Sequence, residues 1–194
     1  MSEVGSAYEF VFRGLLAEEA LDGAGRPTRI KPGMFEADVA EKLSLDILDE
    51  EQVLAAKAMA AVYVAVAAFE NSARALVTTV LREAIDDDWW EKAVSDTIRN
   101  RCKTRQEDEA KHRFHTQRGE APINYTDLGQ LGKIIRQNPE HFVPDFLPSV
   151  EWADAIFDAI ERSRNVIMHS GSLDLEDVER VGMFIRDWVK QVGT

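Results

Sequence analysis

The sequence predicts an all-α fold, an antiparallel bundle of four to five helices with an N-terminal helical extension. Apolar residues recur at spacings of three and four in several long segments, which is the periodicity of an amphipathic helix. Capping residues stand at the starts of most of these segments, and Gly or Pro follows their ends. No segment keeps the two-residue alternation of β-branched side chains that a half-buried strand requires, so little or no sheet is expected.

Residues 1–48 are predicted to form an N-terminal extension, and residues 49–194 the main helical domain. A short amphipathic pattern over residues 8–20 is followed by Gly and Pro residues that interrupt any regular element. The 194 residues, 45% of them hydrophobic, are enough to fill one ordinary core. One domain with an appendage is therefore the expected organisation.

The longest helix is predicted from Asp49 to about Arg82. Asp49 and Gln52 have the spacing of a capping box, and the segment behind them is rich in alanine. Apolar residues fall on two of its faces, one that includes Tyr63 and another that includes Leu54. A helix that is apolar on two sides is expected in the middle of a bundle.

Four further helices complete the predicted domain. One should run from Trp89 to Arg118, and a second should cover residues 127–137 with Thr126 as its cap. The third should follow Ser149 and continue to about His169 before Gly171 ends it. The last should begin near Asp174 and present a stripe of apolar residues to the core, made of Val178, Val181, Ile185, Trp188 and Val192.

Charge and cysteine content predict a cytoplasmic protein without a membrane span. The longest uncharged stretch inside a periodic segment, residues 58–69, is shorter than the roughly 20 apolar residues that cross a bilayer. The N-terminus has neither the basic leader nor the hydrophobic segment of a secretion signal. The single cysteine, Cys102, fits a reducing compartment. The net charge of -12 argues against a general nucleic-acid coat protein, because phosphate would be repelled at long range.

Residues 99–118 nevertheless form a basic island, with seven Lys or Arg residues against three acids. If the helix persists, one of its faces carries four candidate contacts for an RNA backbone, namely Arg101, Arg105, His112 and His115. The alternative is a solvated helix face of mixed charge. Cys102 with two of these histidines supplies too few ligands for a metal site, so no metal and no cofactor are expected.

Arg164 occupies a position where the apolar period asks for a hydrophobic residue. An unpartnered buried guanidinium would cost on the order of several kcal/mol, so Arg164 must have a partner or an opening to water. His169 follows five residues later, a rotation of about 140°, so the two side chains of one chain would not share a face. Asn165 and His169, four residues apart, would share one. A cluster that uses both Arg and His is therefore easier to build from two copies of the helix.

The segment Arg164-Asn165-x-x-x-His169, at the end of the penultimate predicted helix, resembles the ribonuclease motif of the HEPN superfamily. It fits the version of that motif with four residues between Arg and His and with Asn after the Arg. Arg162 with His169 would fit the version with six intervening residues. Ser163 follows Arg162, however, so Arg164 is the favoured arginine.

Other stretches are similar to one HEPN branch, found at the C-terminus of a eukaryotic RNA-surveillance endoribonuclease and in many bacterial proteins. The similarity spans roughly residues 51–192 and leaves out residues 1–48. The stretches that carry it, besides the motif within residues 161–170, are residues 69–74 (FENSAR), 125–129 (YTDLG) and 131–135 (LGKII).

The resemblance implies metal-independent cleavage of RNA by a homodimer whose Arg164 and His169 residues line one cleft. Imidazole can move a proton near neutral pH, and a guanidinium can hold the scissile phosphate and stabilise its developing charge. Asn165 would orient either of them. Some HEPN toxins carry a Tyr two residues after the His, where a partner enzyme attaches nucleotides; Gly171 stands there in this chain, so that regulation is not expected.

Glu70, Asn71 and Arg74 are the candidate supporting residues. Family members often have polar residues near the cleft at the matching place on the long helix. The alternative is a structural ion pair, because Glu70 and Arg74 are four residues apart in the favourable order.

Three functions remain open at this point. The first is an RNA endonuclease, as a toxin or defence effector, with an antitoxin or a protein of a larger system as a further partner. The second is a catalytically inactive HEPN module for dimerisation or partner binding. The third, a nucleotide-binding module, has the least support, because no glycine-rich phosphate loop follows a predicted strand. A purely structural role for Arg164 and His169, as cations at the negative end of a helix, is the remaining interpretation.

Overall fold

The computed structural model of the chain describes residues 34–193, and these residues form α-helices, short 3-10 helices and loops, with no strand among them. The predicted all-α class is confirmed for this part of the chain. The amphipathic pattern over residues 8–20 lies outside the described residues. Two compact units divide the chain, Met1–Val53 and Leu54–Thr194. The described part of the first unit holds α2 (Met34–Lys42), η1 (Leu45–Ile47) and the first turn of α3 (Glu50–Ala84).

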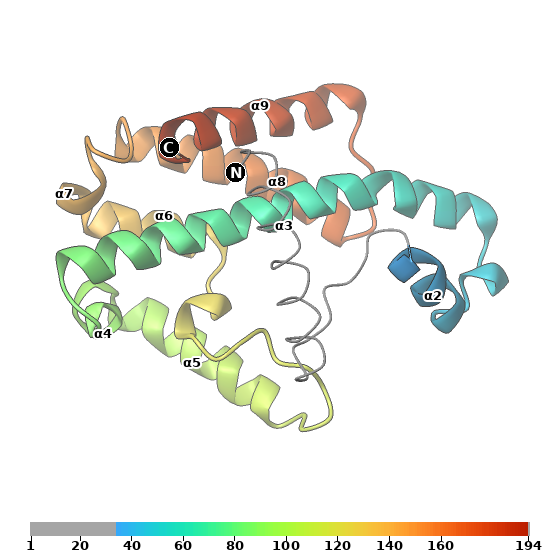
Figure 1. Cartoon of the computed structure of the whole chain (residues 1–194), viewed down its shortest axis with the longest axis horizontal. Helices are drawn as coiled ribbons and strands as arrows, with labels where there is room; N and C mark the ends of the chain where they lie inside the picture. The colour runs from blue at the N-terminus through green and yellow to red at the C-terminus, as the bar shows by residue number, and fades with distance from the viewer. Residues whose placement is uncertain (1–33, 194) are drawn as a thin grey trace, which may run out of the picture. The chain divides into compact units, whose positions relative to one another are not determined.

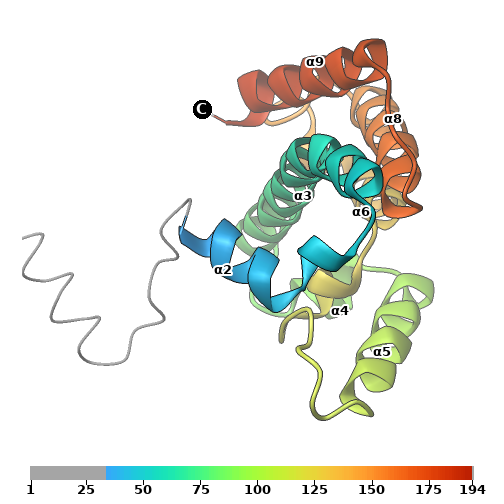
Figure 2. The ribbon, with the colours of Figure 1, turned by 90° about the vertical axis from the view of Figure 1, so that its right-hand side faces the viewer.

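α3 is the long helix that the sequence predicts, and it begins where expected. The Asp49 carboxylate accepts a hydrogen bond from the backbone N–H of Gln52 at 3.0 Å, which satisfies one of the free donors at the helix start. In the second unit, α3 runs between α9 (Leu175–Val192) on one side and α5 (Asp96–Ala110) on the other (Figure 1, Figure 2).

The prediction that α3 is buried on two sides is wrong for its first half. Its buried residues lie on one face and begin only at Val62, whereas Leu54, Tyr63 and Val64 are exposed. The second half packs into the core through Phe69 and other apolar side chains. The apolar pattern could not identify which of the two faces would find a neighbour.

α3 is also the one described helix that is long and apolar enough, by length and composition alone, to cross a membrane. Its most apolar 18-residue window has a mean hydropathy of 1.7, and 17% of that window is buried. The mostly buried core helices of soluble proteins meet the same criteria, whereas most of this window is exposed. A single helix of this kind is weak support for a membrane span, and the chain remains consistent with a soluble protein.

The helix predicted from Trp89 to Arg118 is in fact two helices that are shorter in total. α4 (Trp89–Ala93) ends where Val94 takes an extended conformation, and α5 begins after Ser95 and ends at Ala110. Trp89, Trp90 and Val94 are all buried, so tertiary packing determines the break. Residues 111–118 are all exposed and bury no apolar surface that would extend the helix.

α6 (Leu128–Gln137) has its predicted extent but a different cap. Asp127, rather than Thr126, is the N-cap: its carboxylate accepts from the backbone N–H of Gln130 at 2.8 Å, and the Gln130 side chain accepts from the Asp127 N–H at 3.0 Å. Thr126 instead donates its hydroxyl to the carbonyl of Ile123, within the short helix η2 (Pro122–Tyr125). α7 (Pro139–Phe142) follows α6.

α8 (Val150–Met168) and α9 begin at the predicted capping residues. Ser149 accepts a hydrogen bond from the backbone of Trp152 at 3.1 Å, and Asp174 accepts one from Asp177 at 2.8 Å. Within the predicted stripe on α9, Trp188 and Val181 are buried and the other three residues are partly buried against the core. Both predictions are confirmed.

The end of α8 is closed by a Schellman motif in which Ser170, not Gly171, is the left-handed residue. Ser170 has φ of 61°, and its N–H donates to the carbonyl of Ile167 at 3.2 Å. The N–H of Gly171 donates to the carbonyl of Val166 at 2.9 Å. Gly171 is needed for a different reason: a Cβ there would lie 2.7 Å from the Val166 side chain.

The core joins α3, α8 and α9 through four aromatic side chains. Phe69 meets Phe157 and Trp188 edge to face, with ring centroids 5.8 and 5.3 Å apart. Trp152 stacks on Trp188 at 6.0 Å. These contacts fix the face of α8 that is turned toward α3, and so they direct Arg164, further along α8, toward the same helix.

Candidate functional site

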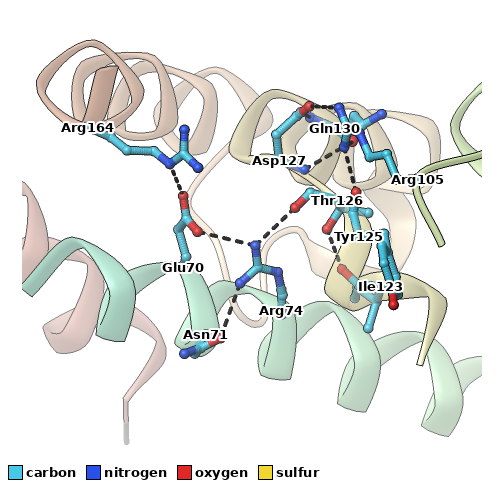
Figure 3. Close-up of polar contacts among 10 residues, drawn as sticks. All are labelled: Glu70, Asn71, Arg74, Arg105, Ile123, Tyr125, Thr126, Asp127, Gln130 and Arg164. Carbon is cyan, nitrogen blue, oxygen red and sulfur yellow. Dashed lines mark hydrogen bonds and ion pairs between the residues drawn. The ribbon is translucent and has the colours of Figure 1, made fainter. Parts of the chain in front are cut away.

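Arg164 of α8 is bound by a carboxylate of α3. Its Nε lies 2.9 Å from Oε1 of Glu70 (Figure 3). The Glu70 side chain is 13% exposed, whereas that of Arg164 is 37% exposed. The sequence required a partner or an opening to water for this arginine, and the structure provides both.

Arg74 binds the second oxygen of the same carboxylate. Its Nη2 lies 3.2 Å from Oε2 of Glu70 and also donates to the backbone carbonyl of Thr126 at 3.0 Å. Its Nη1 donates to the Asn71 side chain at 3.1 Å. The structural Glu70–Arg74 pair is therefore present, and it connects α3 to the segment before α6.

Arg105 of α5 reaches the same segment from the other side. It donates to the carbonyl of Tyr125 at 2.5 Å and to the side chain of Gln130 at 2.9 Å, and it pairs with the Asp127 carboxylate at 3.0 Å. Asp127 thus caps α6 with one oxygen and binds Arg105 with the other (Figure 3).

Glu161 of α8 adds a third carboxyl group. A Cβ on Gly129 would lie 3.3 Å from its Oε2 and 3.7 Å from Oδ1 of Asp127, so the glycine leaves room for both carboxyl groups. Burial, and next the nearby carboxylate of Asp127, raise the pKa of Glu161, while Arg164 opposes the shift.

These contacts form one cluster between four helices, which we call the polar junction: Glu70, Arg74, Arg105, Thr126, Asp127, Gln130, Glu161 and Arg164. Its three arginines face three carboxyl groups, so the positive charge of each guanidinium is largely offset within the cluster. Arg164 makes an ion pair with Glu70 of α3 through its Nε, and its side chain is still 37% exposed, so a ligand can reach it.

His169 and Asn165 lie outside the polar junction. Both side chains are exposed at the last turn of α8, and His169 is the C-cap residue. In the described part of the chain, neither side chain has a hydrogen bond or ion pair to Arg164, which points to α3 instead. One copy of the chain therefore does not assemble Arg164, Asn165 and His169 into a single cluster.

The predicted RNA-backbone track on one helix face is not formed. Helix α5 ends at Ala110, so His112 and His115 belong to the following loop, and Arg105 is engaged in the polar junction. Arg101 is exposed on α5. The prediction that these four residues share a helix face is wrong, because it required a helix that continued past Ala110.

Two hollows border α8. One, of about 320 Å³, lies between α6 and α8 beside Gly129 and is lined by the charged residues Lys133, Arg136, Asp154 and Asp158. The other, of about 200 Å³, lies between α8 and α9 and includes Arg162, Val166 and Arg180. Among residues 34–193, no group of three or more His, Cys, Asp or Glu side chains is placed to hold a metal ion.

Four members of the polar junction were not predicted as site residues: Asp127, Gln130, Glu161 and Thr126. The first two have a visible signal, because Asp and Gln three residues apart before an apolar run indicate a capping box. Glu161 stands one helical turn before Arg164, a spacing that places both on one face of α8.

Comparison of the chain with protein-family models, with curated proteins and with solved structures finds no match in any of the three.

Proposed function

We propose that the chain is a HEPN-type, metal-independent endoribonuclease that acts as a homodimer in the cytoplasm, as a toxin or defence effector. The observation that carries the proposal is the state of Arg164, which is bound to the Glu70 carboxylate yet 37% exposed. A fixed and accessible guanidinium at the end of α8 is what binding of a scissile phosphate requires.

The proposed chemistry divides between Arg164 and His169. Arg164 binds the scissile phosphate and stabilises the charge that develops on it, and Glu70 positions the guanidinium from behind. His169 of the second copy moves a proton from the 2'-hydroxyl or to the leaving 5'-oxygen. Asn165, on the same exposed face as His169, orients the imidazole or the phosphate. The separation of Arg164 and His169 within one chain supports a site shared between two copies.

The first test is cleavage of total RNA in EDTA by the wild-type chain and by Arg164→Ala and His169→Ala. Both variants should lose cleavage while their circular dichroism remains helical. Arg82→Ala is the matched control for the arginine, because Arg82 is exposed on α3 and lies outside the motif. His141→Ala is the control for the histidine. Cleavage that survives in His169→Ala rejects the proposal, as does cleavage that disappears equally in both controls.

A second test addresses the shared site. Arg164→Ala and His169→Ala subunits are mixed, unfolded and refolded together, and the RNA cleavage of the mixture is compared with that of each variant alone. A site formed by Arg164 of one copy and His169 of the other is intact once in each mixed dimer, so activity should return. A site within a single chain cannot be restored in this way.

An inactive HEPN module is the second candidate, and one observation favours it. The carboxyl groups of Glu70, Asp127 and Glu161 offset the arginines of the polar junction, which weakens the attraction for phosphate. Val166 and Met168 expose apolar surface at the end of α8, where a second copy would bind. This candidate predicts no RNA cleavage, and a change in sedimentation from dimer to monomer in Met168→Glu.

A further inference from the structure

The loop after α5 combines exposed cations with an exposed aromatic ring. Residues 111–118 (KHRFHTQR), which we call the basic loop, contain three Lys or Arg, two His and no acid, in a chain with a net charge of -12. Every residue of the loop is exposed. Phe114 is 98% exposed, the highest value among the large hydrophobic side chains of the described residues.

A turn places Phe114 at the tip of this loop. The backbone N–H of His115 donates to the carbonyl of His112 at 2.9 Å, so Arg113 and Phe114 are the two central residues of the turn. The base of the loop is held as well. Arg118 pairs with Glu109 of α5 at 2.6 Å, and its guanidinium lies over the ring of Tyr125 at 5.6 Å.

Local ion pairs leave Arg113 as the available strong cation. Lys111 pairs with Asp108 at 2.6 Å, and Arg118 pairs with Glu109. In residues 34–193, Arg113 has no ion pair, and it stands directly beside Phe114. A lone exposed phenylalanine would be unremarkable on a protein surface. Phe114 differs because cations surround it in an otherwise acidic chain, so this surface favours a ligand that is both aromatic and anionic.

We propose that the basic loop binds single-stranded RNA, with one unpaired base stacked on Phe114 and an adjacent phosphate bound by Arg113. The choice of RNA, rather than another polyanion, rests on the proposed function. The basic loop adds that the RNA is single-stranded. Aromatic side chains stack on any unpaired base, since every base has a π-face, whereas the bases of an A-form duplex are stacked and out of reach.

The loop is mechanically connected to the candidate site. The loop follows α5, and Arg105 of α5 binds Asp127 and the carbonyl of Tyr125 at the start of α6. Arg74 of α3 binds the carbonyl of Thr126 in the same segment. Figure 1 shows the loop beyond the end of α5, on the side of α3 opposite to α9. An RNA strand bound at Phe114 would therefore be held by α5, and the polar junction fixes the position of α5 relative to Arg164.

The binding test uses the His169→Ala chain, so that RNA stays intact. Fluorescence anisotropy measures the Kd for a labelled oligouridine of about twelve nucleotides, alone and as a duplex with its complement. The single strand should bind more tightly than the duplex. Phe114→Ala should weaken binding of the single strand by roughly 5- to 150-fold, the effect of one lost base–aromatic stack. Leu175→Ala, another exposed apolar residue, is the matched control and should leave the Kd unchanged.

Salt dependence tests the phosphate contact separately. Arg113→Gln should lower the slope of log Kd against log salt by about 0.7, the value for one phosphate on a single strand. Lys190→Gln, which removes one exposed positive charge from α9, should leave the slope unchanged. Phe114→Trp should retain binding, and its added indole fluorescence should be quenched by the oligonucleotide.

Three results would overturn the inference: equal Kd values for Phe114→Ala and Leu175→Ala, equal binding of duplex and single strand, or equal binding of anionic vesicles or polyglutamate in place of RNA. The nuclease proposal can fail independently. RNA that binds through Phe114 but is never cut removes the catalytic proposal and leaves this one. RNA that is cut equally well by Phe114→Ala, with an unchanged Kd, removes only this one.

Discussion

Nε of Arg164 and Oε1 of Glu70 lie 2.9 Å apart, and this pair joins the last turns of α8 to the middle of α3. The other oxygen of Glu70 binds Arg74, so one carboxylate holds two guanidinium groups from two helices. Arg74 also binds the backbone before α6. Glu70 is consequently the residue on which the arrangement of the polar junction depends most.

Replacing Glu70 by Gln should lower the free energy of unfolding by about 1–3 kcal/mol, the range for leaving partly buried polar partners unsatisfied. Urea unfolding followed by circular dichroism measures the change. Glu83→Gln is the matched control, because it removes the same charge from an exposed position on the same helix. Equal stability of the two variants would contradict a structural role for the Glu70 carboxylate.

Glycines 132 and 182 should respond differently to substitution by alanine. At Gly182 a Cβ would meet only the flexible end of Arg186 at 3.1 Å, so the higher helix propensity of Ala should stabilise the fold by about 0.5–1 kcal/mol. At Gly132 a Cβ would lie 2.8 Å from the Asp154 carboxylate and 3.3 Å from the buried Phe157 ring. This crowding should cancel the gain at Gly132. The free energy of unfolding of Gly132→Ala should be at least about 1 kcal/mol lower than that of Gly182→Ala. Thermal unfolding of both variants checks the order.

The pH dependence of stability should carry a contribution from Glu161. Burial and the nearby carboxylates raise the pKa of this glutamate in the folded state, so the folded chain binds its proton more tightly than the unfolded chain does. Stability from this group is therefore complete at acidic pH and falls as the pH rises from about 4, the unfolded value, through the folded pKa.

Glu161→Gln should accordingly be more stable than the wild type at pH 7, and the difference should vanish below pH ~4. Urea unfolding at a series of pH values measures it. Glu179→Gln, at an exposed position of α9, is the control and should show no such pH-dependent gain. A Glu161→Gln variant that is less stable than the wild type at pH 7 would mean that its attraction to Arg164 outweighs the cost of burial.

Ser170 should become more favourable as glycine. Its φ of 61° lies in the left-handed region, where a Cβ is strained, and no side-chain hydrogen bond of Ser170 compensates within the described residues. Ser170→Gly should stabilise the chain by about 0.5–1 kcal/mol after the greater entropy of unfolded glycine is subtracted. Ser172→Gly, at a position outside the left-handed region, should give no gain. A loss of stability in Ser170→Gly would contradict the strain.

Helix starts were predictable because their chemistry is local. Asp49, Ser149 and Asp174 each cap the helix that the sequence assigns to them, since the acceptor and the backbone donor are only three residues apart. At α6 two adjacent residues could both cap, and Asp127 prevails over Thr126, whose hydroxyl is used by Ile123.

Features that depend on distant contacts were not predictable from local pattern. Ser95 followed by Asp96 is a helix-start signal, but serine and aspartate also occur inside helices, and the break between α4 and α5 is decided by the burial of Trp89, Trp90 and Val94. The need for a partner at Arg164 could be inferred from its apolar neighbours. That partner, Glu70, stands 94 positions earlier in the chain, and the two residues come together only when α8 packs on α3. The local sequence could therefore not identify it.

The uneven burial of α3 should be visible as a gradient of amide hydrogen exchange along one continuous helix. Its first half buries few side chains and is held mainly by the helix propensity of its alanines, so its backbone amides should open through cheap local fraying. From Phe69 onward the same helix is locked into the core, and its amides should exchange only when the whole domain unfolds.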